Sequence, residues 1–236
     1  MASDQFQFKE FTILQNRCAM KVGTDGVLLG AWTNTNNTQK ILDVGTGTGL
    51  IALMLAQRSQ ATIDAVEIDQ DSAIQARENV EKSPWKDRIK IHHAAIQDYK
   101  NYAQKQYNLI VSNPPFFENA SKSLTRSRTV ARHTDFLSQS DLLKITEKLL
   151  DSAGKLAVIY PCDEANKFQE KSEIFGLFCY RKLSVKPNHN RPIKRILMEL
   201  SHHKLPTQES AIAIESSRKV YTPEFIALIQ DFYLKY

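Results

Sequence analysis

The stretch Lys40-Ile-Leu-Asp-Val-Gly-Thr-Gly-Thr-Gly49 joins a short apolar run to a loop rich in glycine. The run from Lys40 to Val44 is typical of a buried strand, and the residues from Leu50 to Arg58 are typical of a helix. Glycine between the two lets the backbone turn tightly and lets a ligand lie against bare main chain. The stretch therefore predicts a strand, a binding loop and a helix in succession.

Strands and helices alternate over the rest of the chain. The predicted strands cover residues 62–68, 88–93, 107–112, 154–160, 178–185 and 193–200, and the predicted helices cover 27–32, 71–82, 139–150, 163–174 and 223–233. This alternation indicates an α/β fold with a doubly wound, mainly parallel sheet and helices on both faces. Ligands of such sheets bind at the carboxyl ends of the strands.

The composition is compatible with this predicted α/β fold. With 236 residues, 42% hydrophobic and 24% charged, we expect one globular domain. The first ten residues lack the apolar core of a signal peptide, and no apolar run approaches the ~20 residues that span a bilayer. The odd number of widely spaced cysteines favours a reducing cytoplasm. The net charge of +5 suggests a polyanionic partner.

Acidic residues accompany the glycine loop. The loop departs from the dinucleotide pattern G-x-G-x-x-G, because Leu50 stands where the third glycine belongs. Asp43 would repel a pyrophosphate but suits an ammonium group, and Glu67, at the end of the next strand, suits the hydroxyls of a ribose. Asp98 could accept a hydrogen bond from an adenine amine, and Ile68 could pack on the face of that adenine. S-adenosylmethionine combines these groups without phosphate. The alternative is that Asp43 and Asp98 cap helices or turns.

A second motif, Asn113-Pro-Pro-Phe116, follows the predicted strand 107–112. Each proline fixes its own φ and disfavours helix in the residue before it, so Asn113 and Pro114 should be extended. The amide of Asn113 and the bare carbonyl of Pro114 would then lie side by side, with the ring of Phe116 nearby. Such a group could hold a flat molecule bearing an NH2. The alternative is a strand that ends at prolines, with Phe116 in the core.

Two stretches are rich in cations. The polar segment 118–134 follows the proline motif, and the segment 181–195 contains no acid. Both could grip the phosphates of a nucleic acid, or could simply be solvated. The candidate RNA-binding residues are Lys122, Arg126, Arg128, Arg132, Lys186, Arg191, Lys194 and Arg195. No metal is implied, because the adjacent histidines 92–93 and 202–203 would face opposite sides of a strand, as ordinary surface or edge residues.

Residues 41–200 resemble the Rossmann-like methyltransferases that use S-adenosylmethionine. The segment Asp43-Val-Gly-Thr-Gly-Thr-Gly49 looks like their cofactor loop, and Glu67 looks like their ribose-binding acid. The segment Asn113-Pro-Pro-Phe116 looks like the N-P-P-[FY] box of enzymes that methylate an exocyclic or amide nitrogen. The resemblance implies that Asn113 and Pro114 hold the target NH2 and that Phe116 stacks on the base. It also implies a seven-stranded sheet whose last pair includes an antiparallel strand.

The upstream segment Lys21-Val-Gly-Thr-Asp-Gly-Val-Leu-Leu-Gly-Ala-Trp32 narrows the resemblance. It is similar to a segment of the bacterial tRNA (adenine-N6)-methyltransferases that modify adenosine 37 of a valine tRNA. Residues 1–39 would then contribute to the pocket of a single domain whose core is 40–236, with Lys21 and Thr24 near the methionine end of the cofactor or the pocket mouth. The resemblance implies S-adenosylmethionine, a tRNA substrate, no membrane, and a cytoplasmic monomer or weak homodimer.

The expected chemistry is methyl transfer to N6 of an adenosine in tRNA. The two acceptors of Asn113 and Pro114 would align the lone pair of the amine and stabilise the positive charge that develops on its nitrogen. A guanine amine of rRNA, a DNA adenine and a protein glutamine are alternative acceptors, and a non-catalytic RNA-binding module is an alternative of another class. The expected catalytic residues are Asn113, Pro114, Pro115 and Phe116. The expected cofactor-binding residues are Lys21, Thr24, Asp43, Gly45, Gly47, Gly49, Glu67, Ile68, Asp98 and Asn113.

Overall fold

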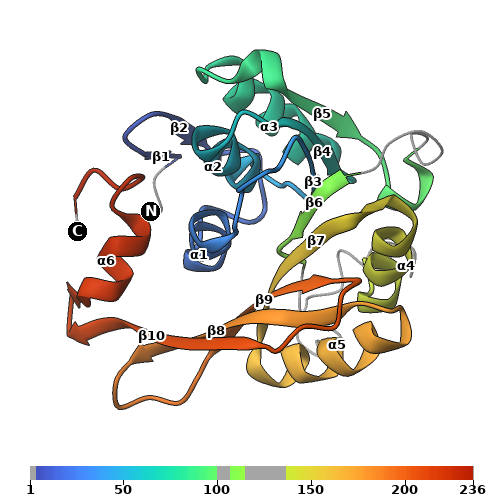
Figure 1. Cartoon of the computed structure of the whole chain (residues 1–236). Coiled ribbons are helices and arrows are strands. Elements are labelled where there is room, and N and C mark those ends of the chain that lie inside the picture. The colour runs from blue at the N-terminus through green and yellow to red at the C-terminus, as the bar shows by residue number, and fades with distance from the viewer. Residues whose placement is uncertain (1–3, 100–106, 115–136, 236) are drawn as a thin grey trace, which may run out of the picture.

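The computed structural model describes residues 4–99, 107–114 and 137–235 (Figure 1). Within these ranges the chain forms a sheet of nine strands in the order β11-β10-β8-β9-β7-β6-β3-β4-β5. Its strands are β3 (Lys40–Val44), β4 (Thr62–Glu67), β5 (Ile89–His93), β6 (Tyr107–Ser112), β7 (Leu150–Pro161), β8 (Phe178–Asn188), β9 (Arg195–Ser201), β10 (Gln208–Ser217) and β11 (Val220–Tyr221). A separate two-stranded sheet pairs β1 (Gln5–Gln7) with β2 (Thr12–Leu14).

The helices lie between the strands and on both faces of the sheet. They are α1 (Thr24–Trp32), α2 (Leu50–Arg58), α3 (Gln70–Glu81), α4 (Gln139–Leu149), α5 (Cys162–Ile174) and α6 (Pro223–Ile229), with short 3-10 helices η1 (Lys86–Arg88) and η2 (Ile96–Asp98). The predicted ranges 40–44, 50–58 and 107–112 match residue for residue. Helix α1 begins earlier than predicted, and α6 ends earlier.

Strand direction confirms most of the expected sheet. The strands β3 to β7 run parallel, and β9 runs antiparallel to both of its neighbours, β7 and β8. The expected number of seven strands was wrong, because β10 adds to β8 in parallel and β11 pairs with β10. The sequence of β10 is mostly polar and exposed, so its periodicity gave no strand signal. Its pairing with β8 makes it a strand.

Alternating side chains of the central strands divide the core into two layers. Ile41, Leu109 and Val111 face a cluster that includes α1, α2 and α6, whereas Leu42 and Ile110 face a cluster that includes α4 and α5. This alternation follows from the two-residue period of a strand. It directs Asp43 and Asn113 to the face of the sheet that carries α1.

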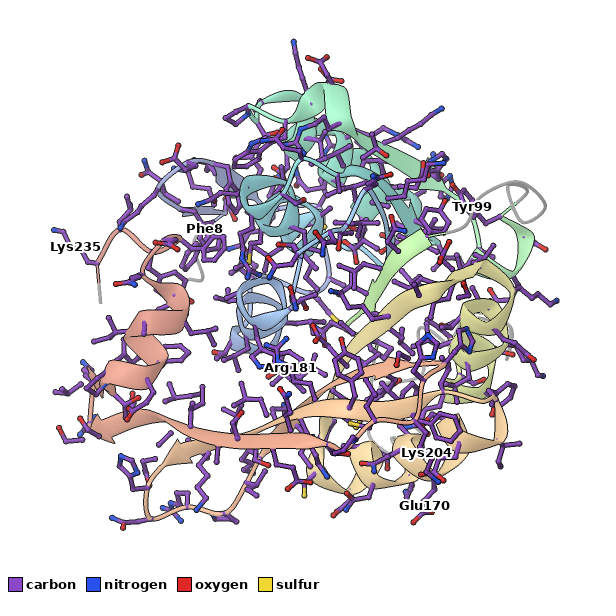
Figure 2. All side chains as sticks on the ribbon, in the orientation of Figure 1. Phe8, Tyr99, Glu170, Arg181, Lys204 and Lys235 are labelled. Carbon is purple, nitrogen blue, oxygen red and sulfur yellow. The ribbon has the colours of Figure 1, made fainter. Side chains whose placement is uncertain are left out.

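The end of α1 is fastened to the sheet by a buried carboxylate. Glu199 is fully buried on β9, and it accepts hydrogen bonds from the backbone of Asn34 and from the side chains of Tyr180 and Arg181 at 2.7–3.0 Å. The guanidinium of Arg181 also lies 3.9 Å from the ring centroid of Trp32. Figure 2 places Arg181 beside α1. Arg181, at the start of the cation-rich segment, therefore has a structural role.

Candidate active site

The glycine loop lies over the carboxyl end of β4. The amides of Gly45 and Thr46 donate to the carbonyl of Val66 at 2.9 and 3.1 Å. Gly45 and Gly47 have φ values of +73° and +57°, and a Cβ added to either would meet no atom within 4 Å. Glycine is therefore required here by backbone conformation and not by crowding. The space above the loop is open to a ligand.

The third glycine of the loop is also required by its backbone conformation. Gly49 precedes α2 with a φ of +83°, and a Cβ there would lie 3.6–3.7 Å from atoms of Ala76 on α3. Its amide donates to the carbonyl of Thr46 at 2.9 Å, which closes the loop. Gly49 thus lies against α3 with room for ordinary contact, while Gly45 and Gly47 border the open space.

Glu67 ends β4 and is held against the loop. Its two carboxylate oxygens accept from the backbone amides of Gly47 at 2.8 Å and Asp69 at 2.9 Å. The side chain is buried, with 8% of the residue exposed. Each carboxylate oxygen can accept a further hydrogen bond, so the oriented pair suits two neighbouring hydroxyls.

Asp43 presents an unsatisfied buried carboxylate. The residue is 0% exposed, and its Oδ2 accepts from the hydroxyl of Thr46 at 2.6 Å. Its Oδ1 has no hydrogen-bond partner within the described residues, and the backbone of Ala52, in the first turn of α2, also interacts favourably with the carboxylate. Burial raises the pKa of Asp43 to about 7. Because an unpaired buried acceptor is costly, a ligand with an ammonium group would supply both the missing donor and the opposite charge.

An apolar cavity adjoins the loop at the ends of β3 and β4. Ile68, in its wall, is 43% exposed, which is unusual for isoleucine and suits packing against a flat ring. Asp98 lies in η2 beside Gln97, which lines the cavity, although Asp98 itself is not in the wall. The sequence had not indicated most of the wall. The lining residues are Val44, Gly45, Val66, Ile68, Ala94, Ile96, Gln97 and Leu137.

Asn113 lies at the carboxyl end of β6, next to α1. A Cβ added to Gly26 would lie 4.0 Å from Nδ2 of Asn113 and 3.1 Å from Cδ2 of Leu50. The hydroxyl of Ser112 donates to the carbonyl of Val44 at 2.9 Å and ties this end of β6 to β3. Pro114 is buried. Gly26 thus lets α1 pack closely on Leu50, with the Asn113 amide in ordinary contact range, a role that sequence reasoning missed.

Two predicted catalytic residues cannot be placed. Pro115 and Phe116 lie outside the described residues, as do Lys122, Arg126, Arg128 and Arg132. Their roles stay predictions.

The segment before α1 is held against the glycine loop through α3. The side-chain amide of Asn79, almost fully buried, donates to the carbonyls of Leu14 and Thr48 at 2.9 Å, and its oxygen accepts from the backbone of Leu14 at 2.8 Å. The carbonyl of Thr48 belongs to the loop itself. Lys21 is exposed, 4.0 Å from a carboxylate oxygen of Asp4, and the exposed Thr24 begins α1. Asn79 therefore couples the N-terminal segment to the candidate site.

The cations of the segment 181–195 do not form one set. Lys186, Arg191 and Lys194 make no ion pair within the described residues, but Nε of Arg195 donates to Oδ2 of Asp25 at 2.7 Å. That ion pair engages Arg195 with the first turn of α1. That Arg195 grips phosphate stays a prediction.

His92 lies half-buried on β5, the last strand of the sheet, so it is an edge residue as predicted, but one with a specific partner. Its Nε2 lies 2.7 Å from Oδ1 of Asp64, whose other oxygen accepts from the hydroxyl of Tyr107 at 2.9 Å. The ring of Tyr99, labelled in Figure 2, meets His92 edge-on at 5.0 Å.

Across the three described ranges, no three His, Cys, Asp or Glu side chains are grouped to hold a metal ion. No helix in these ranges is long and apolar enough to cross a membrane.

The strand order, the antiparallel β9, the glycine loop after β3 and the acid at the end of β4 together define a Rossmann-like methyltransferase. The family model described as the methyltransferase small domain matches residues 19–162. A protein from Trichodesmium erythraeum is 65% identical over the full length of both chains, and one from Parabacteroides distasonis is 47% identical, again over both full lengths. Both relatives are named tRNA1(Val) (adenine(37)-N6)-methyltransferase, and the chain belongs to this methyltransferase family.

Solved structures agree on the fold. A protein from Agrobacterium tumefaciens, described as a predicted O-methyltransferase, superposes with a TM-score of 0.67 at 17% identity over 88% of this chain and 96% of its own. A ribosomal protein L11 methylase from Lactobacillus delbrueckii superposes with a TM-score of 0.52 at 17% identity over 76% and 78%. At such identities the likeness concerns the fold alone. S-adenosylmethionine is the methyl donor that the family and the fold imply.

Proposed function

We propose that the chain transfers a methyl group from S-adenosylmethionine to N6 of adenosine 37 in a valine tRNA. The observation that carries this proposal is the placement of Asn113 directly after Ser112, which pairs with Val44 just before the glycine loop, in a chain 65% identical over its full length to an enzyme of that name. The alternative acceptors named above require the same amine-holding group. A non-catalytic module would need neither the loop geometry nor the oriented Glu67.

The described residues fit the cofactor. Glu67 would accept the ribose hydroxyls, since backbone amides already orient its carboxylate. Asp43 would hold the ammonium end, since its Oδ1 lacks a donor within the described residues. Ile68 would cover the adenine in the apolar cavity, and Asp98 would reach its amine from the neighbouring η2. The bound cofactor supplies an electrophilic methyl group.

Asn113 and Pro114 would hold the target amine. The Asn113 side-chain oxygen and the Pro114 carbonyl would accept hydrogen bonds from the two N–H groups of the amine. Its lone pair would then point in a fixed direction. The same oxygens would stabilise the positive charge that develops on the nitrogen. Phe116 would stack on the flipped base, as in other enzymes that act on extruded bases. No general base is required, because the methylated ammonium is acidic enough to lose its proton to water.

The remaining parts of the proposal concern assembly and location. Residues 1–39 would complete the pocket of one domain that runs to residue 236, with Lys21 and Thr24 near its mouth. The amide network of Asn79 supports this arrangement. Lys186, Arg191 and Lys194, with the cations of 118–134, would contact the RNA. The enzyme would act in the cytoplasm as a monomer or weak homodimer, in keeping with its three free cysteines.

The decisive test is methyl transfer from labelled S-adenosylmethionine to bulk tRNA from cells that lack this protein, followed by nucleoside analysis. We expect labelled N6-methyladenosine at position 37 of one valine tRNA. Asn113→Ala, which leaves Asp43 and Glu67 in place, serves as the inactive control. Label found in rRNA, DNA or protein instead would contradict the proposal that tRNA is the substrate. Cofactor binding without any transfer would overturn the catalytic role.

A further inference from the structure

Two turns that lie far from Asn113 along the sheet are on the same side of it as the active site, at the carboxyl ends of the parallel strands. The strands β8 and β10 run parallel to β6, because β9 is antiparallel to both β7 and β8, and β10 is parallel to β8. The β8–β9 connection and the β10–β11 turn therefore emerge where β6 ends at Asn113. The pairing of Asn188 with Glu215 brings the two turns together, and Figure 1 shows them side by side.

These two turns carry five cations. Lys186 lies near the end of β8 and Arg191 and Lys194 lie in the connection that follows it, whereas Arg218 and Lys219 form the second turn. None of the five forms an ion pair within the described residues, and all except the half-buried Lys186 are exposed. Glu215 is the one acid among the last five residues of β10. The surface they form, which we call the distal basic edge, is therefore strongly positive.

Lys219 stands where glycine or asparagine is expected. Its φ is +64°, a conformation that most side chains avoid, and it occupies the second position of the Arg218–Lys219 turn between β10 and β11. A turn chosen for stability alone would have a glycine there. Strain kept at one position is a pointer to function, and the feature that a lysine adds is its charge.

The distal basic edge is too remote to touch the target base. Four strand spacings separate β6 from β10, and each is about 4.8 Å, so the turn lies roughly 20 Å from Asn113 along the sheet. Phosphates at that distance belong to nucleotides outside the pocket. Contacts of this kind fix the register of a nucleic acid without reading its sequence.

We propose that Arg218 and Lys219, together with Lys186, Arg191 and Lys194, bind the phosphate backbone of the tRNA away from the methylated nucleotide. This inference rests on the proposed function, since it takes tRNA as the partner. The β10–β11 extension of the sheet thereby acquires a role in aligning the substrate. Electrostatic contacts of this type weaken with salt in proportion to the number of phosphates neutralised.

The test compares two double variants with the same loss of charge. Arg218→Gln with Lys219→Gly removes the two turn cations, and the glycine suits the positive φ, so the thermal midpoint should not fall. Lys86→Gln with Lys90→Gln removes two exposed cations near the amino ends of β4 and β5, on the opposite edge of the sheet. Both variants lower the net charge equally.

We expect the turn variant to flatten the dependence of log K on log salt for tRNA by about 0.7–0.9 per lost contact. Its KM for tRNA should rise several-fold, with a smaller change in kcat, while affinity for S-adenosylmethionine stays as in the wild type. The control variant should keep the wild-type slope. An unchanged slope in the turn variant, or an equal change in both variants, would overturn the inference. Failure of the wild type to methylate any tRNA would instead overturn the proposed function.

Discussion

Nε of Arg195 lies 2.7 Å from Oδ2 of Asp25, and this ion pair joins the start of β9 to the first turn of α1. The two residues are 170 positions apart in the chain. Because Gly26 follows Asp25 and borders Asn113, the pair fixes the helix that forms one wall of the candidate amine site. It also connects that wall to the end of the cation-rich segment 181–195.

The first prediction concerns this pair. Asp25→Asn and Arg195→Gln should each lower the free energy of unfolding by about 1 kcal/mol, since the pair is partly exposed and its charges are partly screened. The double variant should lose less than the sum of the single losses. Urea midpoints of the four proteins measure the coupling. Strict additivity would mean that the two side chains do not interact in solution.

The second prediction concerns the approach of α1 to Asn113. Gly26→Ala should leave the protein folded but slow methyl transfer about tenfold or more, because the new Cβ would meet Leu50 at 3.1 Å and displace α1 from the amide. Gly23→Ala is the matched control, since a Cβ there has an ordinary 3.8 Å contact with the carbonyl of Lys21. Single-turnover rates compare the two. Equal rates would show that the close approach has no catalytic value.

The third prediction concerns pH and Asp43. Its pKa is raised to about 7 in the folded protein by burial, above the ~3.9 of an unfolded aspartate. Folding therefore favours the protonated form, and this contribution to stability is complete below about pH 4 and is lost as the pH rises through 7. Without cofactor, the stability of the wild type should fall over this interval relative to that of Asp43→Asn.

Cofactor affinity should show the opposite trend. An ammonium ligand needs the ionised carboxylate, so affinity for S-adenosylmethionine should rise with pH by up to about tenfold per unit below pH 7 and then level off. Calorimetric titrations at pH 5.5, 6.5 and 7.5 measure this. Asp43→Asn should bind weakly with little pH dependence. A wild-type profile that is equally flat would remove Asp43 from the ammonium site.

The fourth prediction concerns Glu67. Glu67→Gln keeps the shape of the side chain but removes the charge, and S-adenosylmethionine affinity should fall by about 1.5–3 kcal/mol, the usual loss for a hydrogen bond to a charged group. Asp69→Asn is a useful control, because Asp69 caps α3 through the amide of Ser72 and faces the helix instead of the loop. Equilibrium dialysis gives both affinities. A wild-type value for Glu67→Gln would exclude it from ribose binding.

The fifth prediction concerns Asn113 itself. Asn113→Ala should reduce the methyl-transfer rate by about 10²–10³-fold, the loss that follows removal of one oriented stabilising group. Cofactor affinity should change little, because the contacts of Asp43 and Glu67 lie on other strands. Rapid-quench measurement with saturating tRNA separates the chemical step from binding. Turnover like that of the wild type would refute the amine-holding role.

Local patterns were sufficient for much of the fold. The strands 40–44 and 107–112 and the helix 50–58 were predicted residue for residue, because period-2 and period-3.6 apolar patterns and glycine or proline boundaries act within a few residues. The glycine loop and its two neighbouring acids were recognisable for the same reason. A tight turn with positive φ and the end of a strand are both local features.

Contacts between distant segments were decided only by the tertiary structure. The polar β10 is a strand because β8 offers its edge, and the cavity wall combines Ile68 with residues from η2 and with Leu137. Gly26 is important because it lies near Asn113 in the folded chain. Arg195 forms an ion pair with Asp25 instead of remaining a free cation. The sequence by itself thus determined the central strands and helices and the chemistry available at their ends. The order of the strands determined which of those ends meet, because side chains hundreds of atoms apart along the chain become neighbours only when the sheet is assembled.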